Sequence, residues 1–411
     1  MSTETTESNV ITDEERIQRL LDVGTVTVEV RESMERKLRS GRQLRVKMGF
    51  DPSAPDIHIG HAVGMRKLRE FQDLGHKVVI IVGDWTAQIG DPSGRSAQRR
   101  MLTAEEVRAN AQTYLDQFFK VVDDDTEKVE IAWQSSWFGD FDLADVLHLT
   151  SKFTVARMLA REDFRTRFES ESPIGIVEFL YPLMQAYDSV AVRADIEMGG
   201  TDQTFNLLVG RDIQREMDQE PQDILTVPIL AGVDGVQKMS KSLRNYVGVT
   251  DEPNDMYGKL MSIPDTALDD YLVLAASLPT DEIDALRASL ADGSGHPRDI
   301  KDRMAASVVE RYHGPESAES ARQEFQRVFQ QRQVPEDMPE FTVSYPATIV
   351  EMLRAAGFAS SNNEARRLVQ QGGVRIDGER IENAEAELSF DAPVVLQAGR
   401  RRFARTVPDA G

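Results

Sequence analysis

Apolar and polar positions alternate with two different periods over the first half of the chain. Gln43 to Phe50 and Lys77 to Val82 are apolar runs of strand length, and His61 to Leu74 between them repeats apolar residues at helical spacing. The helical run stops at Gly75, a common helix terminator. Strands that alternate with helices in this way indicate βαβ units around a parallel sheet. The pattern therefore predicts an α/β, Rossmann-like domain over residues 1–248.

The pattern changes twice further along the chain. From about Asp251 to Arg332 it is helical throughout, which predicts an α-helical domain over residues 249–332. A polar, proline-bearing connector follows, and we assign residues 333–345 to a linker. Residues 346–411 form a small α+β module with two amphipathic helices, Thr348 to Ala356 and Asn363 to Gln370, followed by a hairpin signal at Asp377-Gly378.

Composition narrows the class of protein. The chain contains no cysteine, which excludes disulfides, thiolate metal sites and cysteine nucleophiles. Its longest run of valine, isoleucine and leucine, Val78 to Val82, is far short of the ~20 apolar residues that a membrane helix needs. The amino terminus is polar and acidic, unlike a secretory signal. We expect a cytoplasmic protein without membrane contact.

The net charge of −21 argues against general affinity for nucleic acid. Residues 346–411, however, hold nine arginines against nine carboxylates and are neutral, so the rest of the chain carries the whole negative charge. Any nucleic acid must therefore bind to local basic faces.

The segment His58-Ile59-Gly60-His61 follows the first predicted strand and opens a helix. A helix start presents unpaired N–H groups and a positive dipole end, which together suit phosphate, and Gly60 lets a ligand approach the backbone. Imidazoles at this spacing lie on one face and can both donate to phosphate oxygens. The structural alternative is one capping histidine and one packed histidine. A metal site would need a third ligand, which is not evident nearby.

A second basic segment, Lys238-Met239-Ser240-Lys241-Ser242, follows the largely apolar run Ile224 to Leu230. Two mobile ammonium groups with hydroxyls between them can wrap a triphosphate and neutralise the charge of leaving pyrophosphate. Most loops with two lysines are only solvated. Lysine is scarce in this chain, which favours the functional interpretation.

A third constellation lies on one helical face, where Tyr181, Gln185 and Asp188 are spaced i, i+4 and i+7. A phenol, a carboxamide and a carboxylate there would form a polar pocket wall. The alternative is an ordinary helix with three exposed polar residues. Apolar flanking positions argue against it.

Together, the segments His58 to His61 and Lys238 to Ser242 resemble the two signature motifs of class I aminoacyl-tRNA synthetases. The residues between them resemble tyrosyl-tRNA synthetases of the bacterial type, and the resemblance covers Thr12 to Arg405. It implies an enzyme that activates L-tyrosine with ATP and loads it onto tRNA(Tyr). ATP with Mg²⁺ would enter as a substrate, with no resident metal and no tightly bound cofactor. The family's homodimers imply a dimer here, for which Phe153 to Leu159 offers an apolar interface.

The resemblance also assigns roles to individual residues. Catalysis falls to His58, His61, Lys238 and Lys241. ATP binding falls to Asp51, Ser53, Gly60, Gly200, Asp202, Ser240 and Ser242. Tyrosine binding falls to Asp91, Tyr181, Gln185, Asp188 and Gln203. Asp188 would accept a hydrogen bond from the substrate hydroxyl, and phenylalanine would leave it desolvated and unpaired, a discrimination for which tyrosine-activating enzymes are themselves the usual example.

One position departs from many members of the family. Lys47 stands where they place a tyrosine whose hydroxyl also holds the substrate phenol, and it assigns the chain to a second bacterial subgroup. The ammonium group either pairs with Asp188 or points elsewhere.

The carboxyl-terminal module resembles the S4 RNA-binding module. Guanidinium groups suit phosphates and stack on bases, and the resemblance points to Arg366, Arg367, Arg400, Arg401 and Arg402 as RNA-binding residues. A charged hairpin without a ligand is the structural alternative.

Three other functions fit parts of the pattern: tryptophan activation on the same fold, another nucleotidyl transferase, and an inactive RNA-binding paralogue. Asp188 and the stretch Gly199 to Gln203 disfavour the first. The Lys238 loop combined with an RNA module disfavours the second, and the intact histidine and lysine pairs disfavour the third.

Overall fold

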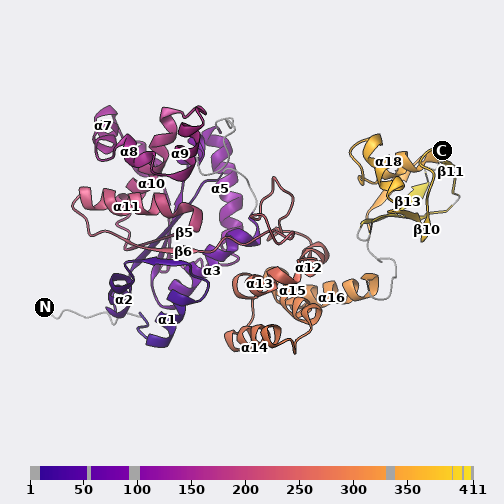
Figure 1. Cartoon of the computed structure of the whole chain (residues 1–411), viewed down its shortest axis with the longest axis horizontal. Coiled ribbons are helices and arrows are strands. Elements are labelled where there is room, and N and C mark those ends of the chain that lie inside the picture. The colour runs from indigo at the N-terminus through magenta and orange to yellow at the C-terminus, as the bar shows by residue number, and fades with distance from the viewer. Residues whose placement is uncertain are drawn as a thin grey trace. The chain divides into compact units, whose positions relative to one another are not determined.

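The computed structural model describes residues 10–52, 57–91, 102–329, 338–390, 392–399 and 402–408. It divides the chain into two compact units, Met1–Glu319 and Ser320–Gly411 (Figure 1). Neither unit has, within these ranges, a helix long and apolar enough to cross a membrane. The predicted domain boundaries stay predictions.

A six-stranded sheet forms the centre of the first unit, in the order β1-β6-β5-β2-β3-β4. All neighbouring strands run parallel except the edge strand β1, which is antiparallel to β6. The strands are β1 (Thr27–Glu29), β2 (Arg45–Phe50), β3 (Lys77–Val82), β4 (Val129–Trp133), β5 (Ile196–Gly200) and β6 (Asp223–Val227). The predicted α/β class with a parallel sheet is confirmed, and the two predicted strands are β2 and β3.

Helices connect and cover these strands, with α10 and α11 on one side of the sheet in Figure 1 and α3 on the other. The predicted helix is α3, which ends before Gly75, where φ is +87°. The helical elements up to residue 216 are α1 (Glu14–Asp22), α2 (Arg31–Arg39), α3 (Ile59–Asp73), α4 (Thr86–Ile89), α5 (Ala104–Phe118), α6 (Ser135–Phe138), α7 (Leu143–Ser151), α8 (Val155–Met158), α9 (Glu162–Glu169), η1 (Ile176–Phe179), α10 (Leu180–Ala191), η2 (Thr201–Gln203) and α11 (Thr204–Glu216).

The strand order determines where a ligand can bind. From β2 the chain crosses to β3 on one side, while β5 pairs with β2 on the other, so the crossover direction changes at β2. A parallel sheet opens a crevice beyond the carboxyl ends of its strands at such a point. The residues that follow β2, β3, β4 and β5 therefore meet at one edge of the sheet.

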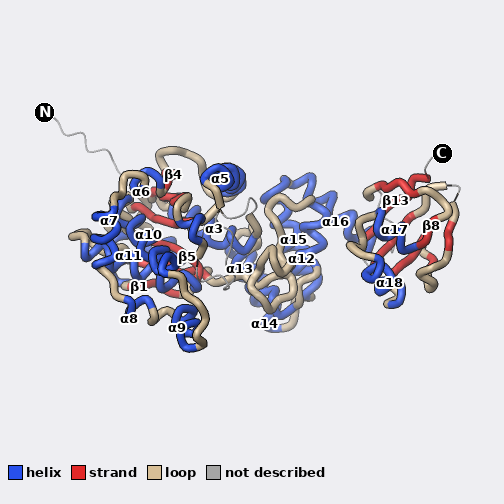
Figure 2. Tube along the Cα trace, turned by 90° about the horizontal axis from the view of Figure 1, so that it is seen from above, coloured by secondary structure: helices blue, strands red, loops and turns tan. Residues whose placement is uncertain are grey.

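The predicted all-helical stretch contains helices joined by short loops, with no strand among its described residues, and strands appear in red only outside it in Figure 2. Its elements are α12 (Pro253–Met261), η3 (Asp265–Ala267), α13 (Leu268–Leu274), α14 (Thr280–Asp292), α15 (Pro297–His313) and α16 (Pro315–Phe329).

The second unit contains a five-stranded sheet in the order β10-β9-β12-β13-β7 and a two-stranded sheet of β8 and β11. Its apolar core includes Leu353, Val374 and Leu396. The elements are β7 (Glu340–Val343), β8 (Ala347–Thr348), α17 (Ile349–Ala355), α18 (Asn362–Gln370), β9 (Val374–Ile376), β10 (Glu379–Arg380), β11 (Glu387–Leu388), β12 (Val395–Ala398) and β13 (Arg402–Pro408). Both predicted helices and the predicted hairpin are present.

β7 lies within the range assigned to a linker and pairs in parallel with β13. A four-residue strand is too short to give a clear alternation in sequence, which is why the pattern missed it. Residues 333–337 of the predicted linker lie outside the described residues.

Candidate active site

A pocket of about 1020 Å³ opens at the carboxyl edge of the six-stranded sheet. Both signature segments line it: His58 and His61 come from the start of α3, and Lys238 to Ser242 from the loop beyond β6. Asp188 of α10 lines the same pocket. Stretches nearly 180 residues apart in sequence thus share one cavity with the predicted specificity residue.

Backbone hydrogen bonds bring the two segments together. Ile59 donates to the Val247 carbonyl at 2.9 Å, and Val249 donates to the Ile57 carbonyl at 3.0 Å, so the chain after the lysine loop runs beside the entry to α3. Met239 is buried against Gly60, where a methyl group would lie 3.4 Å from Met239 Cβ. The methionine holds the loop, and its neighbouring lysines remain at the pocket.

The two histidines stack at the start of α3, with ring centroids 3.7 Å apart. His58 occupies the N-cap position, and its backbone N–H donates to His61 Nδ1 at 3.4 Å. The predicted capping histidine therefore exists, and it lines the pocket as well. Because Nδ1 of His61 accepts, a neutral ring carries its proton on Nε2.

Both imidazoles are neutral near pH 7. Burial, the neighbouring His61 and the lysine pair lower the pKa of His58 to about 2. Enclosure by the pocket walls and the lysine pair lower the pKa of His61 to about 4. Positive charge at this end of the pocket therefore comes from Lys238 and Lys241.

The lysine loop is held by a small polar framework. Asn245 donates to Asp234 at 2.6 Å and accepts from the backbone of Ser240 at 2.8 Å. Lys238 reaches across to Asp202, with 2.6 Å between Nζ and Oδ2. The hydroxyls of Ser240 and Ser242 lie 2.8 Å apart. The predicted catalytic Lys238 and the predicted ATP-binding Asp202 are thus neighbours.

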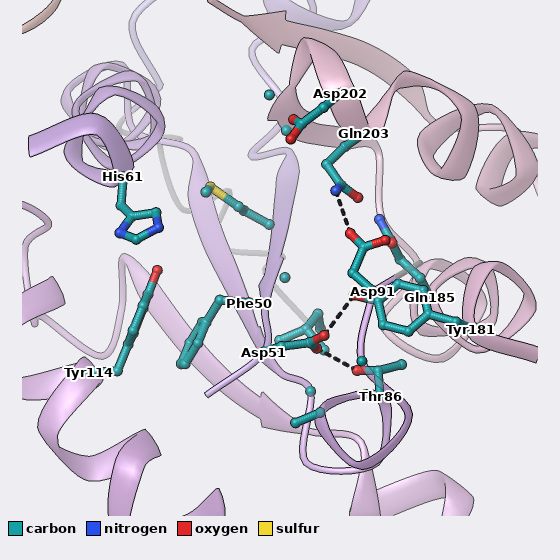
Figure 3. Close-up of a pocket in the computed structure, with 18 of the residues that line it drawn as sticks. Phe50, Asp51, His61, Thr86, Asp91, Tyr114, Tyr181, Gln185, Asp202 and Gln203 are labelled. Carbon is teal, nitrogen blue, oxygen red and sulfur yellow. Dashed lines mark hydrogen bonds between the residues drawn. The ribbon is translucent and has the colours of Figure 1, made fainter. Parts of the chain in front are cut away.

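The opposite side of the pocket carries most of the predicted tyrosine-binding residues (Figure 3). Gln203 donates to Asp91 at 2.7 Å, and the hydroxyl of Tyr181 donates to Asp51 at 2.8 Å. Asp51 also accepts from Thr86 at 2.7 Å. Asp51, expected on the ATP side, therefore contacts the tyrosine side as well. Ser53 lies outside the described residues.

Asp188 is 2% exposed and accepts two hydrogen bonds from Gln134 Nε2, at 2.9 and 3.1 Å. Tyr181 is buried too, so the alternative of an outward polar face on this helix is wrong. Burial raises the pKa of Asp188 to about 8, against the opposing effects of Lys47 and the Gln134 hydrogen bond.

Lys47 pairs with Glu197 rather than with Asp188. Its fully buried Nζ lies 2.9 Å from Glu197 on the adjacent strand and donates to the Gln185 carbonyl at 2.9 Å and to Ser189 at 2.8 Å. Lys47 and Glu197 are register partners of β2 and β5. This resolves the alternative left open by the sequence: the ammonium group anchors α10 to the sheet.

A family model described as tRNA synthetases class I (W and Y) matches residues 39–330, and one described as Tyrosine--tRNA ligase SYY-like C-terminal domain matches residues 330–404. Curated tyrosine–tRNA ligases of Moorella thermoacetica and Thermotoga maritima are 51% and 50% identical to the chain. The matches span 94% and 96% of the chain and 94% and 98% of those proteins. The chain belongs to the tyrosine–tRNA ligases.

Solved structures of tyrosyl-tRNA synthetases share the fold of this ligase. The Archaeoglobus fulgidus protein complexed with L-tyrosine matches with a TM-score of 0.61 at 23% identity, over 75% of this chain and 99% of that one. A truncated mitochondrial protein of Aspergillus nidulans matches with a TM-score of 0.62 at 22% identity, over 77% and 93%.

The predicted RNA-binding arginines of the ligase differ in their surroundings. Arg367 is exposed on α18, whereas Arg366 pairs with Glu385 at 2.7 Å. Arg402 donates one hydrogen bond to the Phe358 carbonyl at 2.5 Å, so part of its guanidinium group is occupied by a contact within its own domain. Arg400 and Arg401 lie outside the described residues.

Several polar residues of this site were not predicted from the sequence. Gln134 directly follows β4 and Thr86 begins α4 after β3, so both stand where strand ends approach the pocket. A search of the residues just beyond each strand would have found them. Arg161 and Asn206 contact the pocket residues from behind, and no local motif marks them.

Proposed function

We propose that this chain is a cytoplasmic tyrosine–tRNA ligase that converts L-tyrosine and ATP to tyrosyl-adenylate and pyrophosphate, then transfers tyrosine to the 3′ end of tRNA(Tyr). The observation that carries the proposal is that the histidine pair, the lysine loop and the buried Asp188 line the same pocket. One end suits a triphosphate, and the other suits a phenol.

At the tyrosine end, Asp188 accepts the substrate hydroxyl, and Asp91, Tyr181 and Gln185 surround the α-ammonium with Gln203 as a neighbour. The hydroxyl of Tyr181 donates its proton to Asp51, so the oxygen lone pairs of Tyr181 can accept a hydrogen bond from the substrate ammonium group. With phenylalanine bound, the buried Asp188 would keep its Gln134 contacts but lose the hydrogen bond from the substrate hydroxyl, and the loss of a partner by a buried polar group costs about 1–3 kcal/mol.

At the ATP end, the neutral imidazoles of His58 and His61 donate N–H groups to phosphate oxygens, and Lys238 and Lys241 supply charge. The adenosine and phosphates contact Asp51, Ser53, Gly60, Gly200, Asp202, Ser240 and Ser242. Mg²⁺ enters with ATP as part of the substrate.

The first step needs no general base, because the tyrosine carboxylate is already ionised near neutral pH. It attacks the α-phosphorus, the bond to the bridging oxygen breaks, and pyrophosphate leaves with its charge neutralised by the lysines. Catalysis is then positioning combined with electrostatic stabilisation of the transferring group. The 3′-terminal ribose hydroxyl of tRNA(Tyr) takes the aminoacyl group in the second step.

The same proposal includes RNA contacts by Arg366, Arg367, Arg400, Arg401 and Arg402. The exposed guanidinium of Arg367 supports an RNA-binding face on α18.

We also propose a homodimer formed through the surface of α7, α8, α9 and η1. Phe153 and Met158 of the predicted interface stretch pack inward. Large apolar side chains are nevertheless exposed along these elements, and a cluster of this kind is typical of an interface. They are Leu143, Leu147, Val155, Phe168, Ile176 and Val177.

The test of the proposed function is ATP–pyrophosphate exchange with each of the twenty amino acids. Exchange with tyrosine alone is expected, and exchange with tryptophan alone would refute the assignment. The role of the lysine loop is tested by the single-turnover rate of adenylate formation in Lys241→Ala, where an unchanged rate would refute it. Lys120→Ala, an exposed lysine outside the pocket, is the matched control.

A further inference from the structure

A guanidinium group lies buried directly behind the proposed ammonium site. Arg161, the residue before α9, is 6% exposed. Its Nη2 donates to Asp91 at 3.2 Å, its Nη1 donates to Asn206 Oδ1 at 3.1 Å, and its Nε pairs with Asp163 at 2.7 Å. Arg161 does not line the pocket itself, so it can act on a substrate only through these neighbours.

Asn206 connects Arg161 by hydrogen bonds to the side-chain amides of two predicted tyrosine-binding residues. It is 1% exposed, and its Nδ2 donates to Gln185 Oε1 at 2.9 Å and to Gln203 Oε1 at 3.1 Å. Gln203 in turn donates through Nε2 to Asp91 Oδ2 at 2.7 Å. The contacts form a closed ring that starts and ends at Arg161.

The ring has a direction because a guanidinium group can only donate hydrogen bonds. Because Arg161 donates to Asn206, the side-chain oxygen of Asn206 must face Arg161, and the NH₂ group of Asn206 must face Gln185 and Gln203. Each glutamine must then turn its own oxygen to Asn206 and its NH₂ group to a carboxylate: Glu197 for Gln185, at 3.3 Å, and Asp91 for Gln203.

We propose that Arg161 is a positioning residue that sets the hydrogen-bond polarity of the tyrosine ammonium site, an inference that rests on the proposed function. A carbonyl oxygen has two lone pairs, and Asn206 uses one of those on Gln185. The fixed orientation therefore presents acceptors, rather than NH₂ groups, to the incoming cation. Without Arg161 the amides of Asn206, Gln185 and Gln203 can flip and direct donors at the ammonium group.

The inference predicts a loss that is specific to ligands carrying an ammonium group. Tyramine has the phenol and the ammonium group but no carboxylate, whereas 3-(4-hydroxyphenyl)propionate has the phenol and the carboxylate but no ammonium group. In Arg161→Met, the KM for tyrosine and the inhibition constant for tyramine are expected to rise by about tenfold or more, as for the loss of charge-assisted hydrogen bonds. The inhibition constant for the propionate and the KM for ATP should change little.

Asn206→Leu provides a second variant that leaves the Arg161–Asp91 and Arg161–Asp163 contacts in place and removes only the relay. It is expected to reproduce the selective loss of tyramine binding. Arg215→Met is the matched control, because it removes a guanidinium from the same helix as Asn206 at a position that is 60% exposed. ATP–pyrophosphate exchange reports all of these constants on the full-length protein, without tRNA.

Equal increases for tyramine and the propionate in both variants would overturn the inference, since they would indicate general damage to the pocket. An unchanged KM for tyrosine in Arg161→Met would overturn it as well. Absence of tyrosine-dependent exchange in the unchanged chain would instead overturn the proposed function, and the inference with it.

Discussion

The buried Lys47–Glu197 pair gives the sharpest prediction about stability. The two side chains are 0% and 1% exposed, and their charged atoms lie 2.9 Å apart between neighbouring strands. Lys47→Met keeps the length and apolar stem of the side chain but leaves the Glu197 charge without its counterion. Three donors remain around that carboxylate, from Ser189, Gln185 and Gln222, but none of them is charged.

Removing one partner of a buried ion pair costs about 3–5 kcal/mol, because the remaining charge stays desolvated. Lys47→Met should therefore lower the free energy of unfolding by about that amount. Adding Glu197→Gln removes the remaining charge, and the double variant should lose only about 1–2 kcal/mol, the value of the hydrogen bonds that are not restored. The pair is thus expected to show a coupling energy of about 2 kcal/mol or more.

Unfolding by guanidinium chloride, followed by tryptophan fluorescence, measures the loss of stability in the unit that contains the ion pair. Trp85, Trp133 and Trp137 all lie in that first unit. Protein concentration must be kept constant because the proposed dimer would make the measured stability depend on it. Lys128→Met is the matched control: this lysine is 43% exposed and pairs with Asp123 at 2.9 Å, and surface pairs contribute at most about 1 kcal/mol. A Lys47→Met cost no larger than this control, or additive costs in the double variant, would refute the anchoring role.

Three further predictions concern other parts of the site. Burial raises the pKa of Asp188 from 3.8 to about 8, so between these pH values the folded protein holds a proton that the unfolded chain has lost. The stability that this proton contributes is complete below pH 3.8 and disappears as the pH rises to about 8. The unfolding free energy of the unchanged chain should therefore fall over this window relative to that of Asp188→Asn, and parallel curves for the two proteins would contradict the shift. A methyl group on Gly200 would lie 2.6 Å from Asp202 Oδ1, so Gly200→Ala should raise the KM for ATP by about tenfold, while Gly258→Ala, with no atom within 4 Å, should leave it unchanged. Arg367→Ala should weaken tRNA binding without affecting tyrosine activation. The slope of the logarithm of the binding constant against the logarithm of the salt concentration should become shallower by about one, and an unchanged slope would exclude a phosphate contact by Arg367.

The local pattern predicted those elements whose stability is largely local. α3 (Ile59–Asp73) covers most of the predicted run His61 to Leu74, and it ends shortly before Gly75, which adopts a positive φ that favours glycine. The Asp377-Gly378 hairpin followed from turn chemistry in the same way, since both residues have positive φ. β7 was missed because its pairing with β13, some 60 residues away, stabilises it rather than its own pattern.

By itself the sequence determined the parallel-sheet class, the helical segment, and the residue types that suit a triphosphate and a phenol. Only the tertiary structure decided that Lys47 pairs with Glu197 instead of Asp188, that Gln134 donates to Asp188, and that Arg161 contacts Asp91. Each of these contacts joins residues more than 50 positions apart, on strands, helices or connecting loops that meet only when the sheet is assembled. The chemical identity of a side chain is local, whereas its partner, and with it its charge state and orientation, depends on what the fold packs against it.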